Sequence, residues 1–200
     1  ITAVMALALM VCLSPFSMGQ ERWANSRTVG LFDGSQLIQK PSPQDSDVMG
    51  FDLVVDGDIL VAGSPCIDNG SPQGNTGSAI VYKWNSDFEE WEFLVSLGNL
   101  LPINGLGSFF EFGYSVDMHG DMIIVGAPGA TDSSGNAVGR AFLFGRDSTN
   151  NDIWQHVGSI DHPMGTIDGR FGSNVALNES YAFVTALNDI NSTGGNGQVW

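Results

Sequence analysis

Three histidines are the first residues to consider for chemistry, because imidazole acts as a general base and as a metal ligand. They are His119, His156 and His162. No two of them have the spacing of a metal-binding pair, and the sequence contains no nucleophile elbow, phosphate loop or paired-cysteine motif. We interpret His119 as a turn residue, His156 as a strand-face residue and His162 as a loop residue. The sequence therefore predicts no catalytic, cofactor-binding or metal-binding residue.

Two carboxylates, Asp117 and Asp121, are close enough in sequence to act as an acid and base pair. Gly120 between them predicts a tight turn, so that the two carboxylates flank a turn. An earlier, similar stretch of the chain has Val54 and Asp58 at the corresponding places. This comparison favours a structural cap as the role of Asp121.

Tryptophan rings offer flat faces on which a sugar could stack. The four to consider are Trp84, Trp91, Trp154 and Trp200. Trp91 and Trp154 begin two similar segments, each with Ser five residues further on. An aromatic ring that recurs at one position of a repeat favours packing between structural units.

Oxygen-bearing side chains in the polar loops could bind calcium, which prefers carboxylate and carbonyl ligands. These residues are Asp68-Asn69, Asp132 with Ser133, Ser134 and Asn136, and Asn188-Asp189. Their spacings differ, and Asp, Asn, Ser and Gly are also the usual residues of exposed turns. No cofactor is predicted, and calcium in these loops stays an open alternative.

A long internal repeat must position all of these residues. Residues 49–65 align without a gap on residues 112–128, and a third copy opens at Phe171. Two further blocks keep almost the same spacing: residues 77–82 recur at 139–144, and residues 91–97 recur at 154–160. A fixed period of about 60 residues is typical of one supersecondary unit that is stacked repeatedly.

Each repeat has the pattern of four short strands. In the second copy, residues 112–118 predict a strand, His119 to Asp121 a tight turn, and residues 122–125 a buried strand. In the first copy the corresponding turn contains Asp56-Gly57, whereas Glu179 replaces the glycine in the third copy and predicts another turn geometry. Third strands are expected at 78–84 and 141–144, and fourth strands at 91–97 and 154–160.

A four-stranded antiparallel meander is too small to bury both of its faces alone. Packing such sheets face to face around an axis solves this problem, which is the architecture of a β-propeller. We therefore predict an all-β fold, a β-propeller of four-stranded antiparallel blades of about 60 residues, present here as an incomplete fragment. A β-sandwich is the competing all-β fold, but it does not predict the internal repeat.

The motif Phe-Gly-x-Ser-Val, followed by Gly-Asp and Val-Gly-Ala-Pro, resembles the FG-GAP repeat. Residues 112–128 match it closely, residues 49–65 have Met49 and Ser64 in place of Phe and Ala, and the third copy keeps Phe-Gly but ends in Thr185-Ala186-Leu187. The resemblance implies a propeller like the head of integrin α subunits and extracellular binding. The calcium loop of integrin-type repeats is replaced here by the short link Asp117 to Asp121, so a calcium site is not inherited there.

The motif residues also have a physical explanation. Phe112 and Phe171 are expected to pack between blades, and the glycine after each lets a neighbouring backbone approach closely. Pro65 and Pro128 are expected to end a strand, because proline has no backbone donor.

The N-terminal segment differs from the repeats. Residues 1–19 are apolar and end in small residues, which predicts a secretory signal peptide that begins part-way; a signal anchor is the alternative. Residues 20–48 are expected to be a linker or part of a closing blade, with one candidate strand at 28–32. Residues 49–200 form the repeats, divided into 49–111, 112–170 and an incomplete 171–200.

Charge and cysteine content limit the partners. Seven basic and 22 acidic residues give a formal net charge of −15, which repels nucleic acid. Cys12 lies in the predicted signal, which leaves Cys66 without a partner in the sequence. Asn69, Asn178 and Asn191 begin glycosylation sequons.

These observations together predict a secreted or cell-surface module of adhesion or recognition that is not an enzyme. Its ligand, a protein or a glycan, would be bound through the blade loops, and membrane contact would come only through an anchor outside this sequence. Two alternatives stay open. One is a propeller hydrolase or the accessory propeller of a larger extracellular enzyme, and the other is a structural protein of a cell wall or matrix.

Overall fold

The computed structural model describes residues 36–39, 41, 48–66, 76–100, 111–190 and 196–200. The predicted signal peptide (1–19), the candidate strand at 28–32, the loop pair Asp68-Asn69 and the sequons at Asn69 and Asn191 lie outside these residues. Residues 36–39, 41 and 48, which belong to the predicted linker, have no assigned strand.

The prediction of an all-β fold made of antiparallel sheets is confirmed. Three sheets follow one another along the chain, with the strands of each in sequence order. Sheet 1 contains β1 (Leu53–Asp56), β2 (Ile59–Ser64), β3 (Ser78–Asn85) and β4 (Glu90–Ser96). Sheet 2 contains β5 (Ser115–His119), β6 (Met122–Ala127), β7 (Arg140–Arg146) and β8 (Trp154–Asp161), and sheet 3 contains β9 (Phe171–Leu177), β10 (Ala182–Ile190) and β11 (Asn196–Val199).

Strand boundaries agree with the sequence pattern to within a few residues. β2 and β6 end directly before Pro65 and Pro128, as expected. The fourth strand was expected to reach Leu97, but this residue begins the 3-10 helix η3 (Leu97–Leu100), where its side chain is fully buried.

The first hairpin turn of each repeat is also close to expectation. The central residues are Gly57-Asp58 and Gly120-Asp121, one position later than the predicted Asp56-Gly57. Both glycines have positive φ, 59° and 56°, as the first central residue of a type II′ turn requires. In the third copy Asn178 forms the turn with its side-chain oxygen, which accepts bonds from the amides of Ser180 and Tyr181. The different geometry predicted from Glu179 is confirmed.

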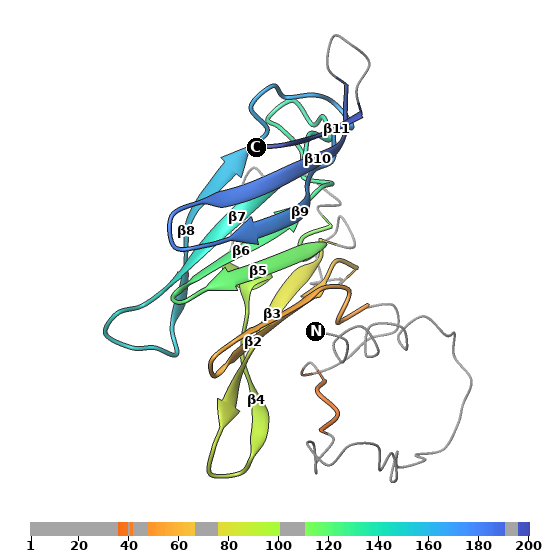
Figure 1. Cartoon of the computed structure of the whole chain (residues 1–200). Coiled ribbons are helices and arrows are strands. Elements are labelled where there is room, and N and C mark those ends of the chain that lie inside the picture. Colours follow the sequence, from red (N-terminus) through yellow and green to blue (C-terminus); the bar gives the residue numbers. More distant parts are fainter. Residues whose placement is uncertain (1–35, 40, 42–47, 67–75, 101–110, 191–195) are drawn as a thin grey trace, which may run out of the picture.

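The three sheets stack face to face in a row, as Figure 1 shows. One core cluster lies between sheets 1 and 2 and includes Val61, Phe112, Ile123 and Phe144. A second cluster, with Ile124, Phe171 and Val184, lies between sheets 2 and 3. Each face of sheet 2 is therefore buried against a neighbour, which explains why β6 is apolar on both faces.

The residues before each first strand form the element that joins one sheet to the next. Phe112 pairs with Gly77 of the preceding sheet, and Phe171 pairs in the same way with Gly139. A Cβ added to Gly113 would lie 2.0 Å from the Ser78 carbonyl oxygen, so glycine is required for this close approach. The predicted role of the Phe-Gly pair is confirmed. We call the three-residue segments 48–50, 111–113 and 170–172 the docking elements.

Carboxylates on the first strands add hydrogen bonds between sheets. Asp52 and Asp56 of the first repeat accept bonds from the amides of Val116 and Gly120, at 2.8 and 2.9 Å. Asp117 of sheet 2 accepts one from the amide of Leu177, at 2.6 Å. These bonds satisfy donors on the open edges of β5 and β9.

Within the described part of the chain, no helix has the length and apolar composition needed to cross a membrane.

Candidate binding surface

One edge of the sheets collects the long loops of the repeat. Because the strands are antiparallel, the starts of β1 and β3 and the ends of β2 and β4 meet at the same edge of sheet 1. The same relation in sheet 2 places residues 129–139 and 162–170 at that edge. This edge is called the loop edge, and it is where the sequence predicted ligand contact.

Four side chains from two consecutive repeats meet at the loop edge. Phe51, directly before the first strand of repeat 1, contacts the ring of Tyr114, its counterpart in repeat 2, with ring centroids 4.8 Å apart. The guanidinium of Arg170 lies over the Tyr114 ring, 5.3 Å from the ring centroid. Arg170 also donates a hydrogen bond of 2.8 Å to Glu111. These four residues are called the loop-edge cluster.

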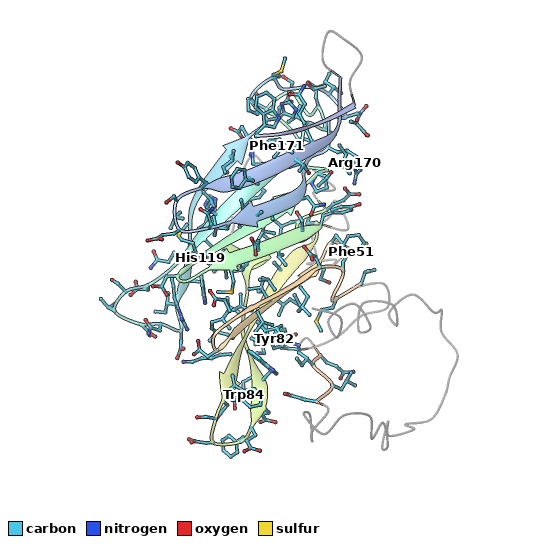
Figure 2. All side chains as sticks on the ribbon, in the orientation of Figure 1. Phe51, Tyr82, Trp84, His119, Arg170 and Phe171 are labelled. Carbon is cyan, nitrogen blue, oxygen red and sulfur yellow. The ribbon has the colours of Figure 1, made fainter. Side chains whose placement is uncertain are left out.

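The cluster is accessible. Phe51 is 48% exposed, and the side chains of Arg170 and Glu111 are 33% and 39% exposed. Figure 2 shows Phe51 and Arg170 at one edge of the row of sheets and His119 at the opposite edge. An exposed Phe51 ring and a half-buried Tyr114 ring beside an arginine combine apolar area with directed hydrogen-bond donors, a composition typical of binding surfaces.

Backbone conformation holds the charged pair in place. Glu111 and Arg170 both have positive φ, 49° and 56°, and Val48 at the same position of repeat 1 has 47°. L-residues rarely adopt this conformation. The docking element imposes it, because it turns the chain sharply before the close approach of Gly113 or Gly172 to the preceding sheet.

The loop between β6 and β7 is closed by Asp132. Its carboxylate accepts bonds from the amides of Ser134 and Asn136 and from the Asn136 side chain. These bonds, that of the Asn136 side chain first, lower the pKa of Asp132 below its usual value. The Asp132 carboxylate oxygens, which were considered for calcium, are thus used to build the turn itself. In the parts of the chain that the structure describes, no group of three or more His, Cys, Asp or Glu is placed to hold a metal ion.

Cys66 follows β2 at the loop edge as a partly buried free thiol. Burial raises the pKa of this thiol, and the negative charge of Glu111 raises it further. A raised pKa keeps the group in its unreactive thiol form at neutral pH.

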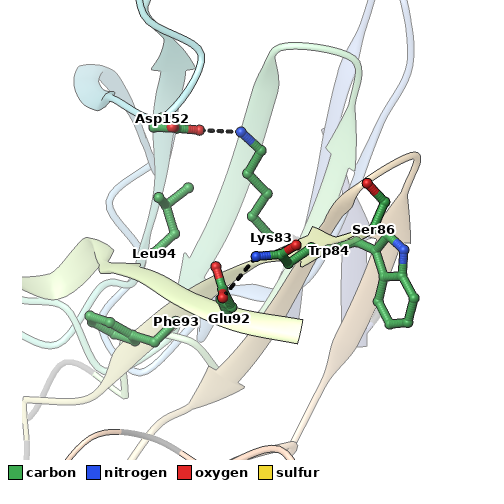
Figure 3. A pocket seen from close by; sticks show the side chains of 8 residues that line it. Lys83, Trp84, Ser86, Glu92, Phe93, Leu94 and Asp152 are labelled. Carbon is green, nitrogen blue, oxygen red and sulfur yellow. Dashed lines mark hydrogen bonds and ion pairs between the residues drawn. The ribbon is translucent and has the colours of Figure 1, made fainter. Parts of the chain in front are cut away.

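A pocket of about 300 Å³ lies away from the loop edge, beside β3 and β4 of sheet 1 and the turn before β8 of sheet 2. Figure 3 shows the side chains that line it. Its walls come from β3, β4 and the turn before β8. The lining residues are Lys83, Trp84, Asn85, Ser86, Glu92, Phe93, Leu94 and Asp152.

The polar groups of this pocket are already paired with one another. Lys83 forms an ion pair of 2.5 Å with Asp152, and the Asn85 amide donates a bond of 2.9 Å to Glu92. Lys83 and Asp152 belong to different sheets, so this ion pair joins the sheets. The loop-edge cluster also contains an ion pair, but it lies at the edge where the long loops collect and is therefore taken as the candidate binding surface.

The three histidines occupy separate places; His156 and His162 lie on a strand and in a loop as predicted, whereas His119, predicted in the turn, is the last residue of β5 and pairs with Met122. His119 is exposed at the end of β5, and His156 lies on β8 with its ring near those of Phe142 and Phe144. His162 follows β8 and is buried, with Nδ1 accepting bonds from the amides of Met164 and Gly165. The sequence placed His162 in a loop but gave no sign of its burial.

Asp117 and Asp121 are also separated by function. Asp117 bonds to sheet 3, whereas Asp121 accepts a backbone bond from the Arg146 amide through its carbonyl and lies 3.8 Å from the Arg146 guanidinium. The predicted role of the Asp121 side chain as a structural cap stays a prediction, because its bond to β7 runs through the backbone.

The tryptophans only partly follow the prediction. Trp154 is buried in the cluster between sheets 1 and 2, as expected, but Trp91 lies on the opposite face of sheet 1 beside Trp84, with ring centroids 5.4 Å apart. Trp154 thus packs between sheets 1 and 2, whereas Trp91, at the same repeat position, lies on a face of sheet 1 that no other described sheet covers. Trp200 is 39% exposed and lies near His162.

The loop-edge cluster was not predicted from the sequence. Phe51 and Tyr114 share one repeat position, and Glu111 and Arg170 share another, which was the available signal. Their meeting depends on how far one sheet is displaced relative to the next.

The family model of the FG-GAP repeat matches residues 107–144, which include β5, β6 and most of β7. No curated protein matches the chain.

Proposed function

The chain carries an FG-GAP repeat, and from this premise we propose that it is an extracellular recognition module whose sheets are successive blades of a β-propeller. Support for the propeller comes from the docking elements, which join sheet 1 to sheet 2 and sheet 2 to sheet 3 in the same way. When each sheet is joined to the next by the same contact, successive sheets are related by the same rotation and are arranged regularly about an axis.

The proposed ligand-binding surface is the loop-edge cluster. The observation that carries this proposal is that two consecutive repeats contribute to one accessible group of side chains, Phe51, Tyr114, Glu111 and Arg170. A surface shared between repeats exists only in the assembled fold. Arginine and aromatic residues are also the side chains that most often dominate binding energy at protein interfaces.

The proposed partner is an extracellular protein or a glycan. The formal net charge of −15 disfavours nucleic acid, and Arg170 is a local positive group on an acidic molecule. We propose a binding role without catalysis, because the three histidines lie apart and Asp117 and Asp121 have separate structural contacts.

Binding can be tested with the secreted chain on an array of glycans and purified extracellular matrix proteins. We expect at least one specific interaction that is weakened about tenfold or more by Phe51→Ala, because an interface hot spot contributes about 2 kcal/mol. Arg170→Lys keeps the charge but loses the planar guanidinium, and it should weaken binding as well.

Phe88→Ala is the matched control. Phe88 is 72% exposed, more than Phe51, but it lies in the turn between β3 and β4 at the opposite edge of sheet 1. Equal loss of binding in the Phe51 and Phe88 variants would contradict the proposed surface. Absence of binding to every protein and glycan tested would contradict the recognition function itself.

A further inference from the structure

The turn between β9 and β10 differs in sequence from the same turn of the other two repeats. Residues 178–180 are Asn-Glu-Ser, whereas residues 119–121 are His-Gly-Asp and residues 56–58 are Asp-Gly-Asp. Asn-Glu-Ser is an acceptor sequence for N-linked glycosylation, which needs an asparagine amide and a hydroxyl group two residues later. Of these three turns, the one in the third repeat therefore has the sequence of a modification site.

The Asn178 side chain uses its oxygen to build this turn and leaves its nitrogen available. Oδ1 accepts hydrogen bonds of 2.8 Å from the amides of Ser180 and Tyr181. Among the described residues, neither Nδ2 of Asn178 nor the Ser180 hydroxyl takes part in a hydrogen bond. A substituent on Nδ2 therefore breaks no bond on which the turn depends.

The turn is also accessible to solvent, because residues 178–180 are all exposed. This exposure does not depend on which sheets lie beside the turn. Residues 119–121 are exposed in the same way, although sheets are packed against both faces of sheet 2. A turn at this position extends beyond the packed faces, and a bulky, hydrated oligosaccharide requires a surface position of this kind.

The turn lies at the edge of the sheets opposite the loop edge. β9 starts at the loop edge with Phe171 and ends at Leu177, directly before the turn. Figure 2 shows the same relation in repeat 2, where His119 lies at the opposite edge from Phe51 and Arg170. A glycan on Asn178 would therefore leave the loop-edge cluster uncovered.

We propose that Asn178 is an N-glycosylation site of the secreted protein and that its glycan occupies the edge opposite the proposed binding surface. This inference rests on the extracellular location in the proposed function, because only chains that enter the secretory pathway are modified in this way. Nδ2 of Asn178 forms a bond to the anomeric carbon of an oligosaccharide, and the bond from that carbon to a lipid diphosphate breaks. The lipid diphosphate leaves with the bonding electron pair, and a base of the transferring enzyme accepts one proton from Nδ2.

The test maps glycans on the full chain after its secretion from eukaryotic cells. Chymotrypsin cleaves after aromatic residues, so cuts after Phe171 and Tyr181 separate Asn178 from the sequon at Asn191. Mass spectrometry of the peptide 172–181 should show the added mass of an oligosaccharide. Enzymatic removal of N-glycans should then convert Asn178 to aspartate and abolish this added mass.

Two substitutions of Ser180 are the matched variants. Ser180→Ala removes the hydroxyl group but keeps the backbone amide that donates to Asn178, so the turn should form without a glycan. Ser180→Thr keeps a hydroxyl group and should keep the glycan. Ser180→Ala should bind the ligand of the recognition module within about twofold of wild type, because the lost glycan lies away from the loop edge.

Three results would overturn the proposal. The first is an unmodified peptide 172–181 in wild-type chain from cells that fully glycosylate a second secreted protein, and the next is a glycan that persists on this peptide in Ser180→Ala. A loss of ligand binding by about tenfold or more in Ser180→Ala would show that the glycan does not lie outside the binding surface. The peptide is analysed whether or not a ligand is found, so a glycosylated chain that binds no partner contradicts the recognition function alone.

Discussion

The contact between Gly126 and Gly172 allows a quantitative prediction for the substitution Gly126→Ala. The added methyl group would lie 2.0 Å from the Gly172 carbonyl oxygen and 2.2 Å from the Ser115 hydroxyl oxygen. Sheet 3 would have to move away by roughly 1 Å to restore ordinary contact. The bond from the Ser115 hydroxyl to the Gly172 carbonyl, 2.9 Å long, joins the same two sheets and would be lost or stretched.

The expected cost follows from these two effects. Overpacking of a well-packed interior costs about 1–3 kcal/mol, and a lost buried hydrogen bond costs about 1 kcal/mol. Replacing a strand glycine by alanine returns about 0.5–1 kcal/mol, because the unfolded chain has less conformational freedom. We therefore expect Gly126→Ala to lower the free energy of unfolding by about 1–3.5 kcal/mol.

Gly158→Ala in β8 is the matched control. No described atom lies within 4 Å of a Cβ built on Gly158, so this variant receives the entropic gain without the clash. Urea unfolding followed by tryptophan fluorescence would give both free energies, and hydrogen exchange would show whether β9 amides lose protection in Gly126→Ala. If the free energies of unfolding of the two variants differ by less than about 1 kcal/mol, the close contact of Gly126 with the Gly172 carbonyl does not limit the side chain at position 126.

Three further predictions concern other parts of the joints and the core. Val48→Asn should stabilise the chain by about 0.5–1 kcal/mol in thermal unfolding, because Val48 has φ of 47° and asparagine tolerates this conformation better; no gain over Val48→Ala would contradict this. Asp117→Ala should cost about 1–3 kcal/mol and speed hydrogen exchange at Leu177, whose amide loses its acceptor, with Asp117→Asn intermediate. Burial raises the pKa of Tyr82 to about 12, so its contribution to stability should be complete below about pH 10 and be lost as the pH rises through 12. An absorbance titration in which Tyr82→Phe still shows this late ionisation would disprove the assignment.

Much of the fold could be predicted from the sequence because its signals are local. β2 and β6 are continuous apolar runs ended by Pro65 and Pro128, and the glycine turns before them fix each hairpin. Errors were confined to element ends, such as Leu97, where a buried leucine can belong to a strand or to a 3-10 turn.

The candidate site was much less predictable. The loops were expected to contact a ligand, and the loop-edge cluster does lie at that edge, but its four residues come from two repeats and from positions up to about 120 residues apart in the sequence. Trp91 shows the same difficulty in the core: its repeat position predicted burial between units, yet burial depends on whether a neighbouring sheet covers that face.

The sequence by itself determined the repeat, the strand order and the residues of the docking elements, because backbone conformation and side-chain alternation depend on neighbouring residues. Only the tertiary structure placed the Gly172 carbonyl oxygen against Gly126, Asp117 against the Leu177 amide, and Arg170 over Tyr114. Each of these contacts joins residues about 60 positions or fewer apart in sequence but in different sheets, and its geometry is set by the offset between stacked faces, which no local pattern encodes.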